Sequence, residues 1–185
     1  MAVILGQINK MKSPRQKRKS PKEQPANVLQ EPAVAYGIAQ SRQVRNSLSL
    51  MGLADIAAYK TIQSTTDFIE RIREGLPKKA LDHLSEIAGL TDIEMAGIIH
   101  TSDRTLRRYA ASQKLNAEQS ERIIELARLY TRGADVFDDI ESFKIWMATP
   151  VDALGGKKPK VFLDTSMGIE LLMEELGRIE QGIFA

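Results

Sequence analysis

Helix-capping signals and apolar residues at helical spacing recur from about residue 65 to residue 185, and this pattern constrains the fold most strongly. Apolar side chains return every three or four positions within segments that begin at a capping residue or proline, or end at a glycine. No convincing alternation of apolar and polar residues is longer than about four or five positions. Aromatic residues make up only 5% of the chain. We therefore expect an all-α protein.

The expected ends of these helices follow from short polar residues and glycines. The predicted N-terminal caps are Thr66, Thr91 with Glu94, Ser102, Asn116 with Gln119, and Asp138, and the predicted ends are Gly75, Gly89 and Gly133. Gly155-Gly156 is interpreted as a helix end and turn rather than a phosphate-binding loop, because no "GK[ST]" follows it. A boundary near residues 133–138 would divide the body into two halves.

The segment "LTDIEMAGIIHTSDRTLRRYAAS" predicts a helix-turn-helix. One helix is expected over residues 92–99 and a second over residues 103–111, with "HTS" between them. The expected inward side chains are Ile93, Met95, Ala96 and Ile99 on the first helix, and Leu106, Tyr109 and Ala110 on the second.

The second of these helices carries the candidate DNA-binding residues. In a helix-turn-helix the second helix enters the major groove, and its N-terminal residues contact base edges. The candidates are Ser102, Asp103, Arg104, Thr105, Arg107, Arg108 and Ser112. The alternative is a structural helix pair with a solvated basic face, since His100 replaces the usual glycine of the turn and Asp92, Glu94 and Asp103 weaken the local positive field.

Basic residues concentrate at the start of the chain. Residues 1–30 hold seven Lys or Arg and one Glu, whereas the net charge of the whole chain is +2. The stretch "KMKSPRQKRKSPKEQP" is rich in charge, Pro and Ser, so we expect residues 1–60 to form a basic, largely disordered extension. It would serve either as a non-specific anchor on nucleic acid or as a solubilising tail.

Several classes of function are not supported by the sequence. The chain has no cysteine, which excludes disulfides and thiolate metal sites and fits a reducing cytoplasm. No apolar run reaches the ~18 residues that span a bilayer, and we expect no secretory signal, because the start "MAVILGQINKMK" is apolar before it is basic. His83 and His100 lie at no catalytic spacing and are expected to be structural or exposed. We expect no enzyme activity, cofactor or metal.

The last helix and the residues after it suggest contacts with a second chain. Its apolar residues are Ile169, Leu172, Leu176, Ile179 and Ile183, a seam suited to packing against another helix. The ending "GIFA" would either tuck onto its own domain or project into a partner's pocket. Trp146 is expected to be a core residue of this half.

Two stretches resemble the MbcA/ParS/Xre antitoxins. "GLPKKALDHLSEIAGLTDIEMAGIIHTSDRTLRRYAASQKLNAEQSERIIELARL" is similar to their helix-turn-helix, and the segment from Phe143 to Ala185 is similar to their toxin-binding domain. The residues that carry the second resemblance are Trp146, Thr149-Pro150, "ALGG", Pro159, "LDT", Gly168 and "RIEQGIF". The resemblance spans roughly residues 65–185, and the basic extension lies outside it.

This resemblance implies an antitoxin with a helix-turn-helix domain at 65–133 and a small helical toxin-binding domain at 138–185. Its partner would be a RES-type, NAD-consuming toxin with an ADP-ribosyltransferase-like fold, whose active site it covers, and it would repress their shared promoter. The candidate toxin-binding residues are Glu175, Arg178, Ile179, Gly182, Ile183, Phe184 and Ala185. We expect a homodimer within a toxin–antitoxin hetero-oligomer, located in the cytoplasm. The alternative is a stand-alone repressor whose C-terminal half only dimerises.

Overall fold

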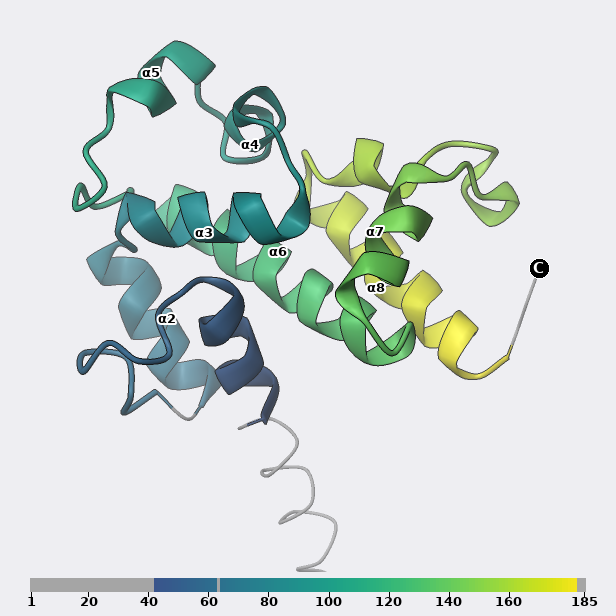
Figure 1. The fold of residues 1–185 in the computed structure, drawn as a ribbon, viewed down its shortest axis with the longest axis horizontal. Helices are drawn as coiled ribbons and strands as arrows, with labels where there is room; N and C mark the ends of the chain where they lie inside the picture. Colours follow the sequence, from purple (N-terminus) through teal and green to yellow (C-terminus); the bar gives the residue numbers. More distant parts are fainter. Residues whose placement is uncertain (1–41, 63, 183–185) are drawn as a thin grey trace, which may run out of the picture.

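The structure, a computed structural model, describes residues 42–62 and 64–182, and within these residues it is helical (Figure 1). This part of the chain contains two isolated β-bridges but no β-strand, which confirms the all-α prediction. Residues 42–50 form the first described helix. It is followed by α2 (Thr65–Glu74), α3 (Lys78–Ala88), α4 (Asp92–Ile98), α5 (Asp103–Arg108), α6 (Ala117–Val136), α7 (Ile140–Ala148), the 3-10 turns η1 (Asp152–Leu154) and η2 (Pro159–Phe162), and α8 (Ser166–Glu180).

Most of the predicted caps are present. Thr91 and Glu94 form the predicted capping box at the start of α4, and Asn116 and Gln119 form another at the start of α6. The side chain of Ser102 caps α5 as predicted. Two caps differ by one or two positions: Ser64 with Asp67 begins α2, and Asp139 begins α7.

Helix α6 does not end at Gly133, so this prediction was wrong. The helix continues to Val136, and Gly133 lies buried inside it. A Cβ atom at this position would clash with the ring of Phe143 in α7. The glycine therefore allows α7 to pack closely on α6. In the sequence alone, a glycine needed for such packing looks the same as a glycine that ends a helix.

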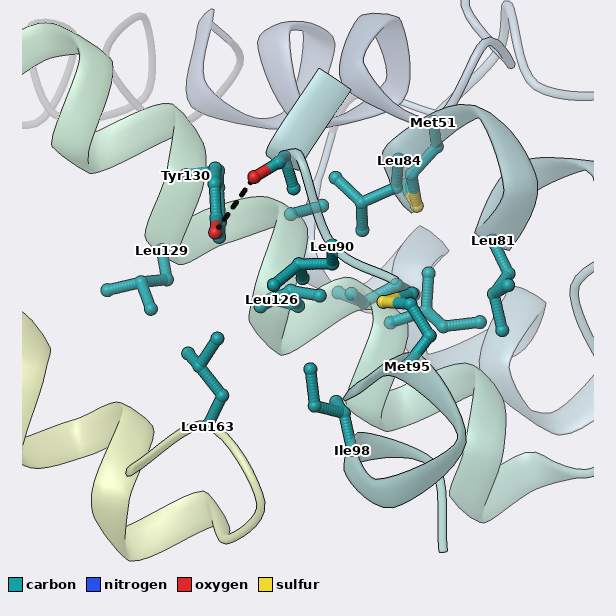
Figure 2. Close-up of a cluster of buried hydrophobic side chains, with 14 of the residues drawn as sticks. Met51, Leu81, Leu84, Leu90, Met95, Ile98, Leu126, Leu129, Tyr130 and Leu163 are labelled. Atoms are coloured by element: carbon teal, nitrogen blue, oxygen red, sulfur yellow. Dashed lines mark hydrogen bonds between the residues drawn. The ribbon is translucent and has the colours of Figure 1, made fainter. Parts of the chain in front are cut away.

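Helix α6 connects the two halves of the described chain. It packs against α2 and α3 on one side and against α7 and α8 on the other (Figure 1). Figure 2 shows Leu126, Leu129 and Tyr130 of α6 among buried side chains from both halves, with the Tyr130 hydroxyl donating to the carbonyl of Ala88 at 3.4 Å. The buried apolar residues form one cluster from Val44 to Leu176, so the core continues across the expected boundary.

Residues 42–62 are folded, which corrects the prediction of a largely disordered extension for this part of it. Met51 and Leu53 are fully buried in the common core. The buried hydroxyl groups of Ser47 and Thr131, which lies in α6, are 3.2 Å apart and hydrogen-bonded. The sequence of this segment is weakly patterned because much of it packs against other elements rather than forming one regular helix. Residues 1–41 lie outside the described residues, so disorder of the basic tail stays a prediction.

Helix α8 uses its apolar seam within its own chain. Ile169, Leu172 and Leu176 are buried and α8 lies along α6. The partner helix that the seam predicts is therefore internal, and this face of α8 is not available to a second copy. None of the helices in the described ranges combines the length and the apolar character needed to cross a membrane.

Candidate functional site

Helices α4 and α5 form the predicted helix-turn-helix. The turn begins after Ile98, and the backbone N–H of Thr101 donates to the carbonyl of Ala96 at 2.8 Å. His100 has a φ of +53°, the left-handed conformation for which glycine is the usual residue. Its ring Nε2 lies 2.9 Å from the carbonyl oxygen of Asp164, and Nδ1 lies 3.2 Å from a carboxylate oxygen of Glu118. Side-chain contacts thus support a backbone conformation that a histidine seldom adopts.

The inward residues of this pair differ partly from the prediction. Met95, Ala96 and Ile99 are buried as expected, and so is Ile98. Ile93 is 69% exposed, because it lies two residues, about 200° around the helix, from Met95.

Helix α5 is shorter than predicted. It ends at Arg108 rather than near Ala111, and Tyr109 already has an extended backbone. Leu106 is the buried residue of this helix, whereas Ala110 is exposed after its end. Helix α5 has six residues and buries only one apolar side chain. Its position therefore depends more on the segments that adjoin it than on its own contacts with the core.

The three arginines of α5 have unequal surroundings. Arg107 lies 3.4 Å from the carboxylate of Asp92 and 3.5 Å from that of Asp103. Arg104 and Arg108 are exposed and have no ion-pair partner among the residues that the structure describes. Two of the three guanidinium groups are therefore free for a ligand, whereas the third already contacts two acids.

The polar candidates for DNA binding are partly engaged in local structure. The Ser102 hydroxyl accepts from the backbone N–H of Thr105 at 3.1 Å and lies 2.8 Å from the Thr105 hydroxyl. Ser112 is exposed in the loop after α5. That loop is attached to α3, since the N–H of Lys79 donates to the carbonyl of Ala111 at 2.9 Å.

The structure changes the description of the candidate toxin-binding residues. Glu175 is only 5% exposed and pairs with Arg178 at 2.6 Å, so it is a buried partner of that arginine rather than a surface group. Arg178 and Ile179 are half-buried at the end of α8, and Gly182 is exposed with a φ of +69°. Ile183, Phe184 and Ala185 lie outside the described residues.

The C-terminal half also contains an aromatic cluster. Phe143 is fully buried, and its ring contacts Tyr130 edge-on with centroids 5.1 Å apart. Trp146 stacks on Phe143 with centroids 5.7 Å apart and also contacts Phe137. Trp146 is only partly buried, so it packs at the edge of the core rather than at its centre.

Three of the motifs that carry the resemblance, Pro159, "LDT" and Gly168, lie in the segment from η2 to the start of α8. Thr165 caps α8 by accepting from the N–H of Gly168 at 3.0 Å. A Cβ at Gly168 would clash with the carbonyl of Phe162, so the glycine permits close packing of η2 on α8. Pro159 begins η2 and is buried. Pro159, Leu163 and Gly168 are buried and shape this loop, whereas Asp164 and Thr165 are exposed at its surface.

Arg122 is a buried polar residue that the sequence analysis missed. It lies in α6 and is 4% exposed. Its guanidinium donates to the carbonyls of Ile98 at 3.1 Å and Leu163 at 2.6 Å, and it also contacts Glu125 and Ser166. A signal existed in the sequence, because Arg122 shares a helix face with the apolar Leu126 and Leu129 at i+4 and i+7.

No group of three or more His, Asp and Glu side chains in the described ranges is arranged to hold a metal ion. A shallow groove of about 190 Å³ lies between α4 and η2, lined among others by Ile93, Val161 and the ion pair of Glu94 with Lys160.

Comparisons with known proteins match both halves of the chain. The family described as "Antitoxin Xre-like helix-turn-helix domain" matches residues 67–128, and the "Antitoxin Xre/MbcA/ParS C-terminal toxin-binding domain" matches residues 132–182. Residues 42–62, which complete the core, precede both matches.

Curated relatives agree with these matches. An "Antitoxin Xre" from Photorhabdus laumondii is 34% identical over 60% of this chain and 77% of the relative, and one from Yersinia enterocolitica is 28% identical over 65% and 82%. A "Prs ADP-ribosylating antitoxin" from Sphingobium is 30% identical over 69% of this chain and 88% of the relative. The helix-turn-helix geometry, the two family matches and the coverage of these relatives agree, and the chain belongs to the Xre/MbcA/ParS family of antitoxins.

Proposed function

We propose that this antitoxin neutralises a RES-type, NAD-consuming toxin with an ADP-ribosyltransferase-like fold, and that it represses its own promoter by binding operator DNA. The match to the toxin-binding domain over residues 132–182 is the observation that carries the first part. The name of the Sphingobium relative contains "ADP-ribosylating", which supports a partner of this kind.

Operator binding is proposed for the exposed face of α5. Arg104 and Arg108 are exposed cations, and a guanidinium can bind guanine or a phosphate with two parallel hydrogen bonds. Ser102, Asp103, Thr105, Arg107 and Ser112 complete the proposed contact region.

Toxin binding is proposed for the end of α8 and the residues that follow it. Arg178, Ile179 and Gly182 lie at this end, and the sequence continues with Ile183, Phe184 and Ala185. In this proposal Glu175 has an indirect role: its buried carboxylate holds the Arg178 guanidinium. The terminal residues would enter the toxin active site and exclude its substrate.

A helix-turn-helix reads one operator half-site, so we propose that two copies act together within the toxin complex. The seam of α8 is covered by α6, so the two copies would associate through another surface.

Co-expression with the product of the adjacent reading frame tests this function. The full chain should restore growth and bind a duplex from its own promoter, whereas deletion of Ile183–Ala185 should abolish growth rescue and leave promoter binding intact. Lys158→Ala, an exposed change remote from the end of α8 in sequence, is the control and should behave as the wild type. Promoter binding by a full chain that rescues no growth would instead support a stand-alone repressor.

A further inference from the structure

We propose that residues 160–166 of the toxin-binding half belong to the DNA-binding unit, because they hold the α4–α5 turn in the position that operator binding needs. This inference rests on the proposed operator binding. The side chains of Arg122, His100 and Lys160 link this loop to the helix-turn-helix. They are positioning residues and are not proposed to contact DNA.

Arg122 links the turn to the loop directly. Its Nε donates to the carbonyl of Ile98, the last residue of α4, and its Nη2 donates to the carbonyl of Leu163. Its Nη1 donates to the hydroxyl of Ser166 at 2.9 Å, at the first turn of α8. A guanidinium has five N–H donors in one plane, so a single side chain can fix three segments at once.

His100 makes a second link from within the turn. Both acceptors of its ring are oxygens, the carbonyl of Asp164 and the carboxylate of Glu118. A neutral imidazole carries one N–H, so only the protonated ring donates to both. The same ring thus connects the left-handed residue of the turn to α6 and to the loop before α8.

Lys160 makes a third link at the opposite end of α4. Its ammonium lies 2.5 Å from the carboxylate of Glu94, which also accepts from the backbone N–H of Thr91 in the capping box. Burial raises the pKa of Glu94, but the hydrogen bonds from Lys160 and Thr91 outweigh it and leave the pKa lowered. The loop therefore contacts α4 near its first turn as well as at its end.

Apolar packing accompanies these polar contacts. Leu163 and Ile98 are both buried and line the groove between the loop and α4. Figure 2 shows their side chains directed toward the core residues of α6. Because α5 contributes only Leu106 to the core, its orientation depends strongly on the turn that this loop supports.

Lys160→Ala in the full chain tests the inference, with Lys158→Ala as a matched control. Both substitutions remove one positive charge from the same segment, but only Lys160 is paired with α4. We expect Lys160→Ala to weaken binding of a promoter duplex by about threefold to fivefold, the upper part of the range for one partly exposed ion pair, and Lys158→Ala to change it less than about twofold. Amide hydrogen exchange in residues 98–103 should accelerate only for Lys160→Ala.

His100→Gly separates the side-chain contacts from the shape of the turn. Glycine relieves the left-handed backbone and removes both hydrogen bonds, so we expect weaker operator binding and faster amide exchange despite the easier φ. The inference is overturned if His100→Gly binds the duplex as well as the wild type, or if the two lysine variants are equivalent. If the wild type binds no promoter duplex, the proposed function fails, and amide exchange alone decides whether the loop holds the turn.

Discussion

At the scale of single residues, the structure distinguishes three arginines that look alike in the sequence. Arg107 contacts Asp92 and Asp103, whereas Arg104 and Arg108 have no ion-pair partner in the described part of the chain. We expect Arg104→Ala and Arg108→Ala to weaken operator binding by about 1–3 kcal/mol wherever the arginine contacts a base. Arg107→Ala should have a smaller effect, because its charge is already neutralised.

Fluorescence anisotropy with a promoter duplex at several salt concentrations measures this difference. The salt slope is the slope of the logarithm of the binding constant against the logarithm of the salt concentration. Removal of an arginine that neutralises a phosphate should reduce the magnitude of this slope by about one. Arg107→Ala should leave the slope nearly unchanged. A slope that falls for Arg107→Ala but not for Arg104→Ala would contradict the assignment.

His100 predicts a dependence of stability on pH. The hydrogen bonds to the carbonyl of Asp164 and to Glu118 raise the pKa of His100 above its ordinary value, against desolvation and the nearby charge of Arg122. A raised pKa in the folded state means that the contribution is fully present below about pH 6.5, the value of an unfolded histidine, and is lost as the pH rises through the higher folded value.

Thermal unfolding between pH 5.5 and 8.5 should show this contribution as a difference between the wild type and His100→Asn. Asparagine tolerates a left-handed backbone, so the comparison isolates the ring. The stability advantage of the wild type should shrink as the pH rises through this window, and an advantage that grows instead would contradict the assignment.

Residues whose partners are close in sequence were predictable. Thr91, Ser102 and Asn116 cap helices by accepting from the backbone N–H three positions on, so a local pattern is sufficient. Arg122 and Glu175 were not recognised, because their burial depends on partners or packing from distant segments. Glu175 and its exposed neighbour Glu174 look equivalent in the sequence, yet they point in different directions around α8.

At the scale of helices, two glycines that both lie inside a helix differ in what surrounds them. Gly133 lies inside α6 against the ring of Phe143, whereas a Cβ placed on Gly177 in α8 would meet no side chain or neighbouring element within 4 Å. We expect Gly133→Ala to destabilise the protein by about 1–3 kcal/mol through overpacking. Gly177→Ala should stabilise it by about 0.4–1 kcal/mol, since alanine restricts the unfolded chain and fits the helix. Urea unfolding of both variants measures the difference, and equal shifts would contradict the packing argument.

The end of helix α5 depends on contacts with another helix. The sequence predicts the start of α5 correctly through Ser102, but α5 stops earlier than expected because Tyr109 becomes extended and the following loop bonds to α3. The order of helices and turns follows from the local sequence, whereas the end of α5 depends on contacts with α3.

At the scale of the whole molecule, α6 turns two predicted parts into one core. The family matches divide between residues 128 and 132, yet α6 runs through this point without a break. Residues 42–62 join the same core, although their sequence shows little periodicity. The order of the functional regions was therefore predictable, but their shared core was not, since it is formed by contacts between segments far apart in the sequence.

Because the core is shared, we expect a destabilising substitution in residues 42–62 to lower the stability of the C-terminal half as well. Met51→Ala, in the segment before the family matches, should lower the free energy of unfolding by about 2–5 kcal/mol because Met51 is fully buried. Trp146 is the only tryptophan of the chain and reports on the C-terminal half. If the described chain unfolds as one unit, Trp146 fluorescence and far-ultraviolet circular dichroism should show the same shift in the denaturant midpoint. Met167→Ala, at a methionine that is 79% exposed, is the control and should cause almost no shift. A Trp146 transition that stays at the wild-type midpoint in Met51→Ala would show that the two halves unfold separately, and that α6 does not unite them.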